Sequence, residues 1–149
     1  MIYSSACAYA IRALSRLVML RPERDRNILL DELCGDTDLP RHFVAKIFQT
    51  LVREGLLTSS KGRGGGFALA KAADKITLFD IVAIIDGTDS FDQCVVGMAK
   101  CSDHQPCPLH DQWKGIRMSI KAYLESTTLE QMGNSLEVKL AKLGKQPKA

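Results

Sequence analysis

The most informative stretch of the chain is residues 39–70, LPRHFVAKIFQTLVREGLLTSSKGRGGGFALA. Pro40 suits the first turn of a helix, and Gly55 suits the position just after its end. At 100° per residue the apolar side chains of this helix fall on one side, in a stripe of Val44, Ile47, Phe48 and Leu51. The spacing therefore predicts a helix from Pro40 to Glu54 with one buried face.

Two short strands are expected after this helix, at 56–59 and 66–70. The glycine-rich segment between them suits a flexible hairpin tip that carries Lys61 and Arg63. A phosphate-binding loop would end in Gly-Lys-Ser or Gly-Lys-Thr and lead into a helix, whereas these glycines lead into a strand-like segment. Helix, turn, helix and basic hairpin is the order of a winged helix-turn-helix.

Helices and a strand are also expected before this stretch. Ser4 and Ser5 can cap a helix that reaches about Leu20, with its apolar residues at helical spacing. A short strand at 28–30 comes next, and Asp31 can cap a short helix that stops near Gly35. This short helix and the 40–54 helix form the predicted helix-turn-helix.

Three further helices are expected after the hairpin. Thr77 and Asp80 have the spacing of a capping box that opens a helix to about residue 85. Pro108 begins a long helix to about residue 126, and Thr127 with Glu130 forms a second capping box for a last helix to about residue 143. The predicted fold is mainly α with a small β-wing: a winged helix-turn-helix head plus a long dimerisation helix.

Charge is distributed unevenly along the chain. The whole sequence has a formal net charge of +3, but residues 39–75 hold seven basic and two acidic residues, and residues 78–111 hold six acidic residues and one basic. The first segment can face a polyanion and the second cannot.

We expect double-stranded DNA to contact the outer face of the 40–54 helix and the hairpin tip. That face carries basic groups and no acid, although it could also be an ordinary solvated helix side. Side chains of the helix could reach base edges, while those of the hairpin would meet phosphates or the minor groove. The expected DNA-contacting residues are Ser4, Arg41, His42, Lys46, Gln49, Lys61 and Arg63.

The composition predicts a cytoplasmic protein that does not cross a membrane. The apolar run at 81–85 is only five residues long, whereas a spanning helix needs roughly 20. Arg12, Arg16 and Arg21 interrupt the segment that would form the apolar part of a secretory signal. Five cysteines cannot all pair within one chain, which favours metal or redox chemistry in a reducing compartment.

Three cysteines and a histidine, Cys94, Cys101, Cys107 and His110, fall within seventeen consecutive positions. Their gaps of six, five and two residues are wide for a structural zinc site and match neither ferredoxin pattern. The spacing leaves an iron-sulfur centre, zinc and a thiol switch open. His104 is a nearby rival that we expect to be solvated, and Cys7 and Cys34 are expected to be buried apolar residues.

The long helix has a seam of apolar residues at spacings of four, three, four and three: Leu109, Trp113, Ile116, Ile120 and Tyr123. This seam could pack within the chain on the preceding helix. We expect homodimerisation instead, because a small head would leave a long amphipathic helix with little to cover it.

The chain resembles the Rrf2-type winged-helix regulators, and most closely their IscR-like iron-sulfur members. The resemblance runs over most of the sequence, and its most specific part is the Gly-x-Gly-Gly-Gly-aromatic wing followed by three spaced cysteines. The matching residues are Ser4-Ser5, Tyr9-Ala10, Ala13-Leu14, 51–57, the wing at 62–69, 78–82, the cysteine loop and Thr128-Leu129.

The resemblance implies that Cys94, Cys101 and Cys107 are cluster ligands and that His110 completes a 2Fe-2S site within one chain. Ala8 stands where NsrR-like members carry an acidic ligand from the partner subunit, which disfavours that kind of 4Fe-4S site. Ala45 replaces a glutamate of IscR, so the operator sequence cannot be transferred from IscR to this chain.

We therefore expect a winged head at 1–77, a cluster loop with dimerisation helices at 78–143, and a disordered tail at 144–149. The expected function is a homodimeric transcriptional regulator, either a repressor or a dual regulator, whose operator binding is controlled by an iron-sulfur cluster. The cluster would sense redox state, nitric oxide or iron-sulfur status, and 2Fe-2S is favoured over 4Fe-4S or zinc. The alternative is a winged-helix protein-interaction adaptor with structural zinc or a thiol switch. The sequence carries no enzyme motif and no evident small-molecule substrate site.

Overall fold

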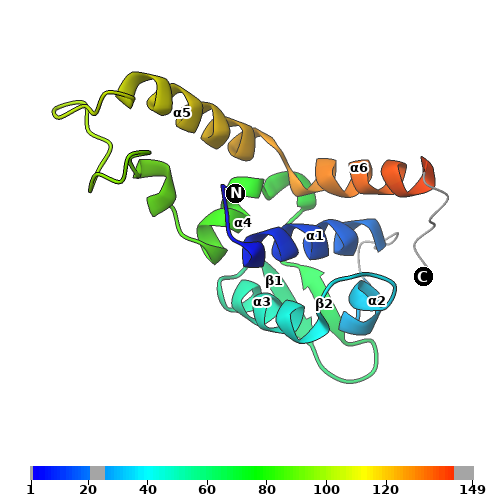
Figure 1. Ribbon diagram of the computed structural model, residues 1–149. Coiled ribbons are helices and arrows are strands. Elements are labelled where there is room, and N and C mark those ends of the chain that lie inside the picture. Colours follow the sequence, from blue (N-terminus) through cyan, green and yellow to red (C-terminus); the bar gives the residue numbers. More distant parts are fainter. Residues whose placement is uncertain (1, 21–25, 143–149) are drawn as a thin grey trace.

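The computed structural model describes residues 2–20 and 26–142, with side chains of the last helix described to residue 139. Figure 1 shows a head of short elements from which α5 and its preceding loop project to one side. The elements in chain order are α1 (Ser5–Leu20), α2 (Leu30–Cys34), α3 (Arg41–Arg53), β1 (Leu57–Ser60), β2 (Gly66–Leu69), the 3-10 turn η1 (Ala73–Lys75), α4 (Leu78–Ile85), the 3-10 turn η2 (Asp89–Asp92), α5 (His110–Ser126) and α6 (Leu129–Lys142).

The head is a winged helix-turn-helix, as the sequence predicts. The apolar stripe of α3 is buried, and Phe48 within it meets Phe67 of β2 edge to face, with ring centroids 5.1 Å apart. Strands β1 and β2 pair antiparallel from Leu57↔Leu69 to Ser60↔Gly66. A Cβ at residue 66 would lie 2.5 Å from the carbonyl oxygen of Ile28, so only glycine fits where the wing meets the chain before α2.

Local capping signals near the chain start are confirmed in part. Ser4 Oγ accepts the N–H of Cys7 and so caps α1, as expected. Asp31 was expected to cap α2, and that prediction is wrong: the Glu32 carboxylate accepts the N–H of Leu29 instead, while Asp31 pairs with Arg41. The strand expected at 28–30 is also reduced, to one antiparallel bridge between Ile28 and Phe67.

Helix α4 begins as predicted, because Thr77 and Asp80 form a reciprocal capping box. The second box lies one residue later than predicted. Thr128 and Gln131 form it, since the carbonyl of Thr127 already accepts the N–H of Leu78. This pairing continues as a bridge between Thr77 and Thr128, which ties the start of α6 to the start of α4.

Helix α6 returns to the head and lies along α1 (Figure 1). Leu129 is fully buried in the same core as Leu14 of α1 and Ile81 of α4. One hydrophobic core therefore extends across the boundary expected between residues 77 and 78. The division into a DNA-binding part and a cluster-binding and dimerising part stays a prediction.

Two further expectations concern the chain as a whole. The tail expected at 144–149 lies outside the described residues. Within the described residues, no helix has both the length and the apolar character that a bilayer span requires.

Candidate functional site

The four predicted ligands lie in and just after one loop, between η2 and α5. This loop is the extended segment at the far end of the molecule from α2 (Figure 1). Cys94, Cys107 and His110 are buried, and Cys101 is half-buried. The loop therefore turns its ligand side chains inward, away from solvent.

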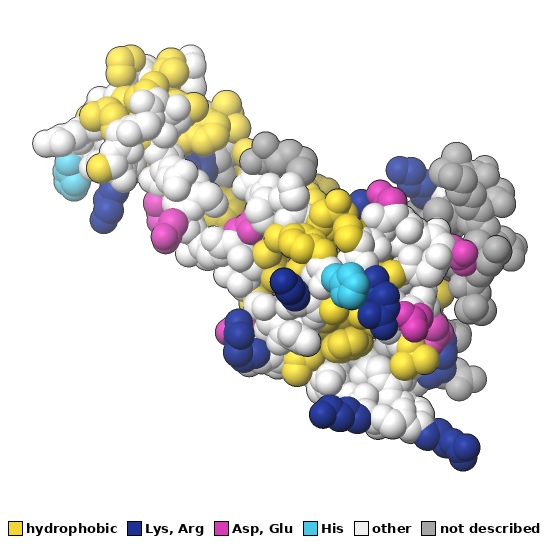
Figure 2. All heavy atoms as spheres, turned by 60° about the horizontal axis from the view of Figure 1, so that its bottom comes forward, with side chains coloured by type: hydrophobic (Ala, Val, Ile, Leu, Met, Phe, Trp, Pro, Cys, Tyr) yellow, Lys and Arg dark blue, Asp and Glu magenta, His cyan; other side chains and the backbone are white. Residues whose placement is uncertain are grey.

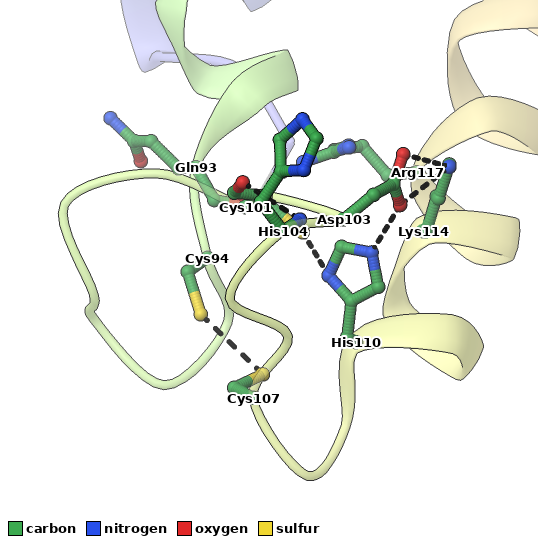
Figure 3. Close-up of polar contacts among 10 residues, drawn as sticks. Gln93, Cys94, Cys101, Asp103, His104, Cys107, His110, Lys114 and Arg117 are labelled. Carbon is green, nitrogen blue, oxygen red and sulfur yellow. Dashed lines mark hydrogen bonds and ion pairs between the residues drawn. The ribbon is translucent and has the colours of Figure 1, made fainter.

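The four predicted ligands form two pairs (Figure 3). The sulfur atoms of Cys94 and Cys107 are 3.7 Å apart, and the Cys101 sulfur is 3.2 Å from Nδ1 of His110. Among the residues that the structure describes, no three histidine, cysteine or acidic side chains surround a single point that could hold a metal ion. The structure thus brings all four residues into one loop but keeps the pairs distinct.

Helix α5 anchors the stem of this loop. Nε1 of Trp113 donates to the carbonyl of Gln93 at 3.0 Å, and Arg117 donates to the same oxygen at 3.4 Å. In the middle of the loop, the N–H of Cys101 donates to the carbonyl of Asp92. The residue next to Cys94 is therefore held by the helix that begins at His110.

Backbone amides surround the Cys94 sulfur. The pKa of the Cys94 thiol is lowered, first by the N–H of Val96 and then by the N–H of Met98, the Cys107 side chain and the N–H of Gly97. Burial opposes this lowering only in part. For Cys107 the Leu109 N–H acts in the same direction, but burial and the neighbouring Cys94 raise its pKa overall. Of the two thiols, Cys94 is therefore the one that ionises at the lower pH.

The two remaining cysteines are buried in the head, as predicted. Burial first, and then Asp86, raises the pKa of Cys7 to about 12. Burial also raises the pKa of Cys34, and the nearby cations Arg41 and Arg16 only partly oppose it. Neither thiol is suited to binding a metal, which requires the thiolate.

His110 sits in a polar network that sequence reasoning missed. Its Nε2 is 2.7 Å from Oδ1 of Asp103, and Lys114 Nζ lies 2.8 Å from both oxygens of that carboxylate. Lys114, and then His110, lower the pKa of Asp103 to about 2. The four-residue spacing of His110 and Lys114 on a predicted helix could have indicated that their side chains lie on one face. No sequence signal indicates that Asp103, in a polar loop, would contact both of them. His104 is exposed, as expected.

The donor set fits a thiophilic metal centre. Two sulfurs bound at about 2.3 Å to one tetrahedral metal lie about 3.8 Å apart, and the Cys94–Cys107 distance of 3.7 Å matches that edge. A mononuclear zinc site needs all four donors around one point. Two separate pairs match instead the requirement of two neighbouring metal ions, each with two protein ligands.

The predicted DNA-binding side chains other than Ser4 belong to α3 and to the wing of the head. Figure 2 views this side, where Lys, Arg and His side chains lie across the face and Lys and Arg reach its lower edge. Exposed residues of this set are His42, Lys46, Gln49, Lys61 and Arg63. Arg41 is exposed but pairs with Asp31. Ser4 is exposed and donates from both its N–H and Oγ to Asp86.

The same face contains an aromatic residue that the sequence reasoning did not select. Phe43 of α3 is 40% exposed and packs edge to face on Tyr9 of α1, with ring centroids 5.5 Å apart. The sequence could have indicated its exposure, because Phe43 follows His42 and lies outside the buried stripe of α3. An exposed aromatic ring among cations suits apolar contact with a base edge.

The apolar seam of α5 divides into two parts. Trp113 and Ile120 are half-buried within the chain, and Ile120 packs against the head core. Leu109, Ile116 and Tyr123 are 46%, 53% and 61% exposed. Intrachain packing on α4 therefore covers one edge of the seam and leaves the other edge uncovered in the single chain.

Comparison with known proteins gives a consistent result. The Rrf2 family model, described as an iron-dependent transcriptional regulator, matches residues 3–135. A protein of Aquifex aeolicus named as an HTH-type transcriptional regulator is 34% identical over 136 residues, which cover 90% of this chain and 92% of that protein. The regulator IscR of Erwinia tasmaniensis is 29% identical over 64% of this chain and 58% of its own length.

Two solved structures share the fold. CymR of B. subtilis, the global cysteine regulator, superimposes with a TM-score of 0.74 at 23% identity, covering 89% of this chain and 95% of its own. IscR of T. potens gives a TM-score of 0.69 at 20% identity over 98% of this chain and 92% of its own. At these identities the two structures support the winged-helix architecture.

Proposed function

Because the chain belongs to the Rrf2 family of iron-dependent transcriptional regulators, we propose that its operator affinity is controlled by an iron-sulfur cluster. The chain is a transcriptional regulator and not an enzyme. We place it in the cytoplasm, where it would act on double-stranded DNA.

The observation that carries this proposal is the arrangement of four donors as two pairs. Cys94 with Cys107 and Cys101 with His110 provide two ligands for each of two metal ions, which is what a 2Fe-2S cluster requires. When bound, such a cluster supplies a centre whose charge and integrity respond to oxidants and to iron supply. We therefore favour 2Fe-2S over 4Fe-4S or zinc.

DNA binding in this proposal uses α3 and the wing. Exposed Lys46 and Gln49 lie on the outer side of α3, where a recognition helix presents side chains to the major groove. Lys61 and Arg63 at the wing tip would neutralise phosphates or enter the minor groove.

The regulator would act as a homodimer through the exposed edge of the α5 seam. Leu109, Ile116 and Tyr123 recur every seven residues and present apolar surface along the whole length of α5. A second copy of the same helix would cover this surface and place two DNA-binding heads side by side.

A chain of contacts connects the loop with the DNA-binding head. Gln93 lies directly after η2, and Phe91 of η2 packs on Phe79 of α4 with ring centroids 5.3 Å apart. At the other end of α4, the Asp86 carboxylate accepts hydrogen bonds from Ser4 at the start of α1. A change of loop order on cluster loss would reach α1 through these contacts.

The proposal is tested by anaerobic reconstitution with iron and sulfide. Wild-type protein should hold about two iron and two sulfide per chain and show an iron-sulfur absorption spectrum. Cys94→Ala, Cys101→Ala and Cys107→Ala should lose most of the cluster. The matched controls are Cys34→Ala and His104→Ala, which remove a thiol and an imidazole outside the two pairs. Stoichiometric zinc with no sulfide would overturn the proposal.

A second candidate function is a thiol switch, favoured by the 3.7 Å separation of the Cys94 and Cys107 sulfurs. A peroxide could take two electrons and two protons from these thiols, forming one disulfide and water. CymR of S. aureus, which shares the fold of this chain, has been crystallised in an oxidised form. Protein that gains no sulfide but forms a reversible Cys94–Cys107 disulfide that changes DNA affinity would favour this candidate.

A further inference from the structure

His110 is a buried histidine whose two ring nitrogens face different chemical groups. Its side chain is 4% exposed. Nδ1 faces the Cys101 sulfur at 3.2 Å, and Nε2 faces the Asp103 carboxylate at 2.7 Å. Figure 3 shows the ring lying between these two partners. The environment therefore distinguishes the two nitrogens.

The hydrogen-bond network assigns the proton of the ring. Asp103 is ionised, because the ammonium group of Lys114 lies 2.8 Å from both of its oxygens. An ionised carboxylate only accepts hydrogen bonds, so Nε2 must donate and carry the proton. A neutral imidazole protonated at Nε2 has its lone pair on Nδ1, directed toward Cys101.

Lys114 fixes this arrangement through the helix. His110 and Lys114 are separated by one turn of α5, so their side chains lie on the same face. Asp103 bridges them from the loop, two residues after Cys101. Three charged or polar groups thus hold the ring, the loop and the start of α5 in one geometry.

We infer that Asp103 is a positioning residue that turns His110 so that Nδ1 is the atom that binds the cluster. This inference rests on the proposed function, since a cluster must be present for Nδ1 to bind it. A carboxylate on the second ring nitrogen fixes the tautomer of a metal-binding histidine and raises its basicity. Asp103 contacts His110 and would not contact iron.

The first arm of the test uses the full chain without metal, under reducing and anaerobic conditions. Long-range proton–nitrogen NMR spectra report the tautomer of each of the three histidines in the chain, with His42→Ala and His104→Ala used for assignment. We expect wild-type His110 to be protonated at Nε2. Asp103→Leu should shift it to a mixture of tautomers. A wild-type ring protonated at Nδ1 would overturn the inference.

The second arm uses cluster-loaded protein made with histidine labelled with nitrogen-15 at Nδ1 only or at Nε2 only. After one-electron reduction of the cluster, electron–nuclear double resonance should detect strong hyperfine coupling from the Nδ1 label. Strong coupling from the Nε2 label would overturn the assignment of the ligand atom.

The third arm measures the rate of cluster loss to a chelator. Asp103→Leu should lose its cluster about 10-fold or more faster than wild type, since removing such a partner costs about 10- to 100-fold in metal affinity. Asp103→Asn keeps an oxygen acceptor and should fall between the two. Asp111→Asn is the matched control, because it removes the same charge from the residue that follows His110. Equal rates in all four proteins would contradict a positioning role.

These arms separate failure of the inference from failure of the proposed function. Wild-type protein that holds a 2Fe-2S cluster without Nδ1 coupling overturns only the role of Asp103. Wild-type protein that takes up no iron or sulfide overturns both, whatever tautomer the metal-free protein shows.

Discussion

The sulfur atoms of Cys94 and Cys107 lie 3.7 Å apart although thirteen positions separate the residues in the sequence. A turn closed by the Gly97 N–H on the Cys94 carbonyl starts the return of the chain, and Gly97 has the positive φ of 82° that this turn uses. A second turn joins the His110 N–H to the Cys107 carbonyl and leads into α5. These two turns therefore bring the Cys94 and Cys107 side chains together.

Cys7 is expected to react slowest of the five thiols in reduced, metal-free protein. Its side chain is fully buried, and burial and Asp86 raise its pKa to about 12, so its thiolate is scarce at pH 9, where an ordinary thiol is mostly ionised. Its reactivity should rise only as the pH approaches 12 or when the protein unfolds. Alkylation followed by mass spectrometry checks this order, and labelling of Cys7 as fast as the half-buried Cys101 would contradict it.

Removing either wing charge should weaken DNA binding at all sequences. Lys61→Ala and Arg63→Ala should each reduce the magnitude of the slope of log affinity against log salt by about one, because each substitution removes one phosphate contact. The measurement is a fluorescence anisotropy titration at several salt concentrations. Lys139→Ala is the matched control, since it removes an exposed lysine from α6, on the other side of α1 from the wing. Equal slopes for the wing variants and the control would remove the wing from the interface.

A charge on the exposed edge of the α5 seam should dissociate the dimer. Ile116 and Met118 are 53% and 59% exposed, and at 100° per residue they lie on nearly opposite sides of the helix. Ile116→Glu should shift the protein from dimer to monomer in sedimentation or light-scattering measurements, whereas Met118→Glu should not. A dimer that tolerates Ile116→Glu but not Met118→Glu would place the interface on the other side of α5.

Helix α6 depends on a glycine for its close approach to α1. A Cβ at Gly133 would lie 2.6 Å from Cγ1 and 2.9 Å from Cβ of Val18, a stiff side chain that cannot easily move away. Gly133→Ala should therefore destabilise the protein by about 1–2 kcal/mol in chemical denaturation, despite the better helix propensity of alanine. Gly115→Ala in α5 is the control, because its Cβ would meet nothing within 4 Å. A Gly133 variant as stable as the Gly115 variant would refute this packing.

Sequence reasoning succeeded where the signal was local. The buried stripe of α3 follows from its own periodicity, and Thr77 with Asp80 forms the predicted cap because both partners lie in the same helical turn. The prediction for Asp31 failed because two partners compete. Glu32 reaches the free N–H of Leu29, and Arg41, ten residues away, holds Asp31.

Features that depend on contacts between distant segments could not be read from the sequence. Helix α6 approaches α1 closely at Gly133 and Val18, and no periodic pattern connects these two residues. The pairing of Cys94 with Cys107 is not encoded in their spacing. The sequence likewise holds no signal for the contact between Asp103 and His110, whose residues lie seven positions apart.

Cluster control of DNA binding is tested most directly by the operator affinity of one preparation with and without its cluster. An operator is first selected from a random DNA pool with anaerobic, cluster-loaded protein. The same protein is then freed of cluster by a chelator, kept reduced, and titrated on the selected DNA, with the Cys94→Ala variant as a second cluster-free form. Cluster control of DNA binding predicts at least a tenfold difference between the loaded and both cluster-free forms. Equal affinity in all three would show that the cysteine–histidine loop does not control DNA binding.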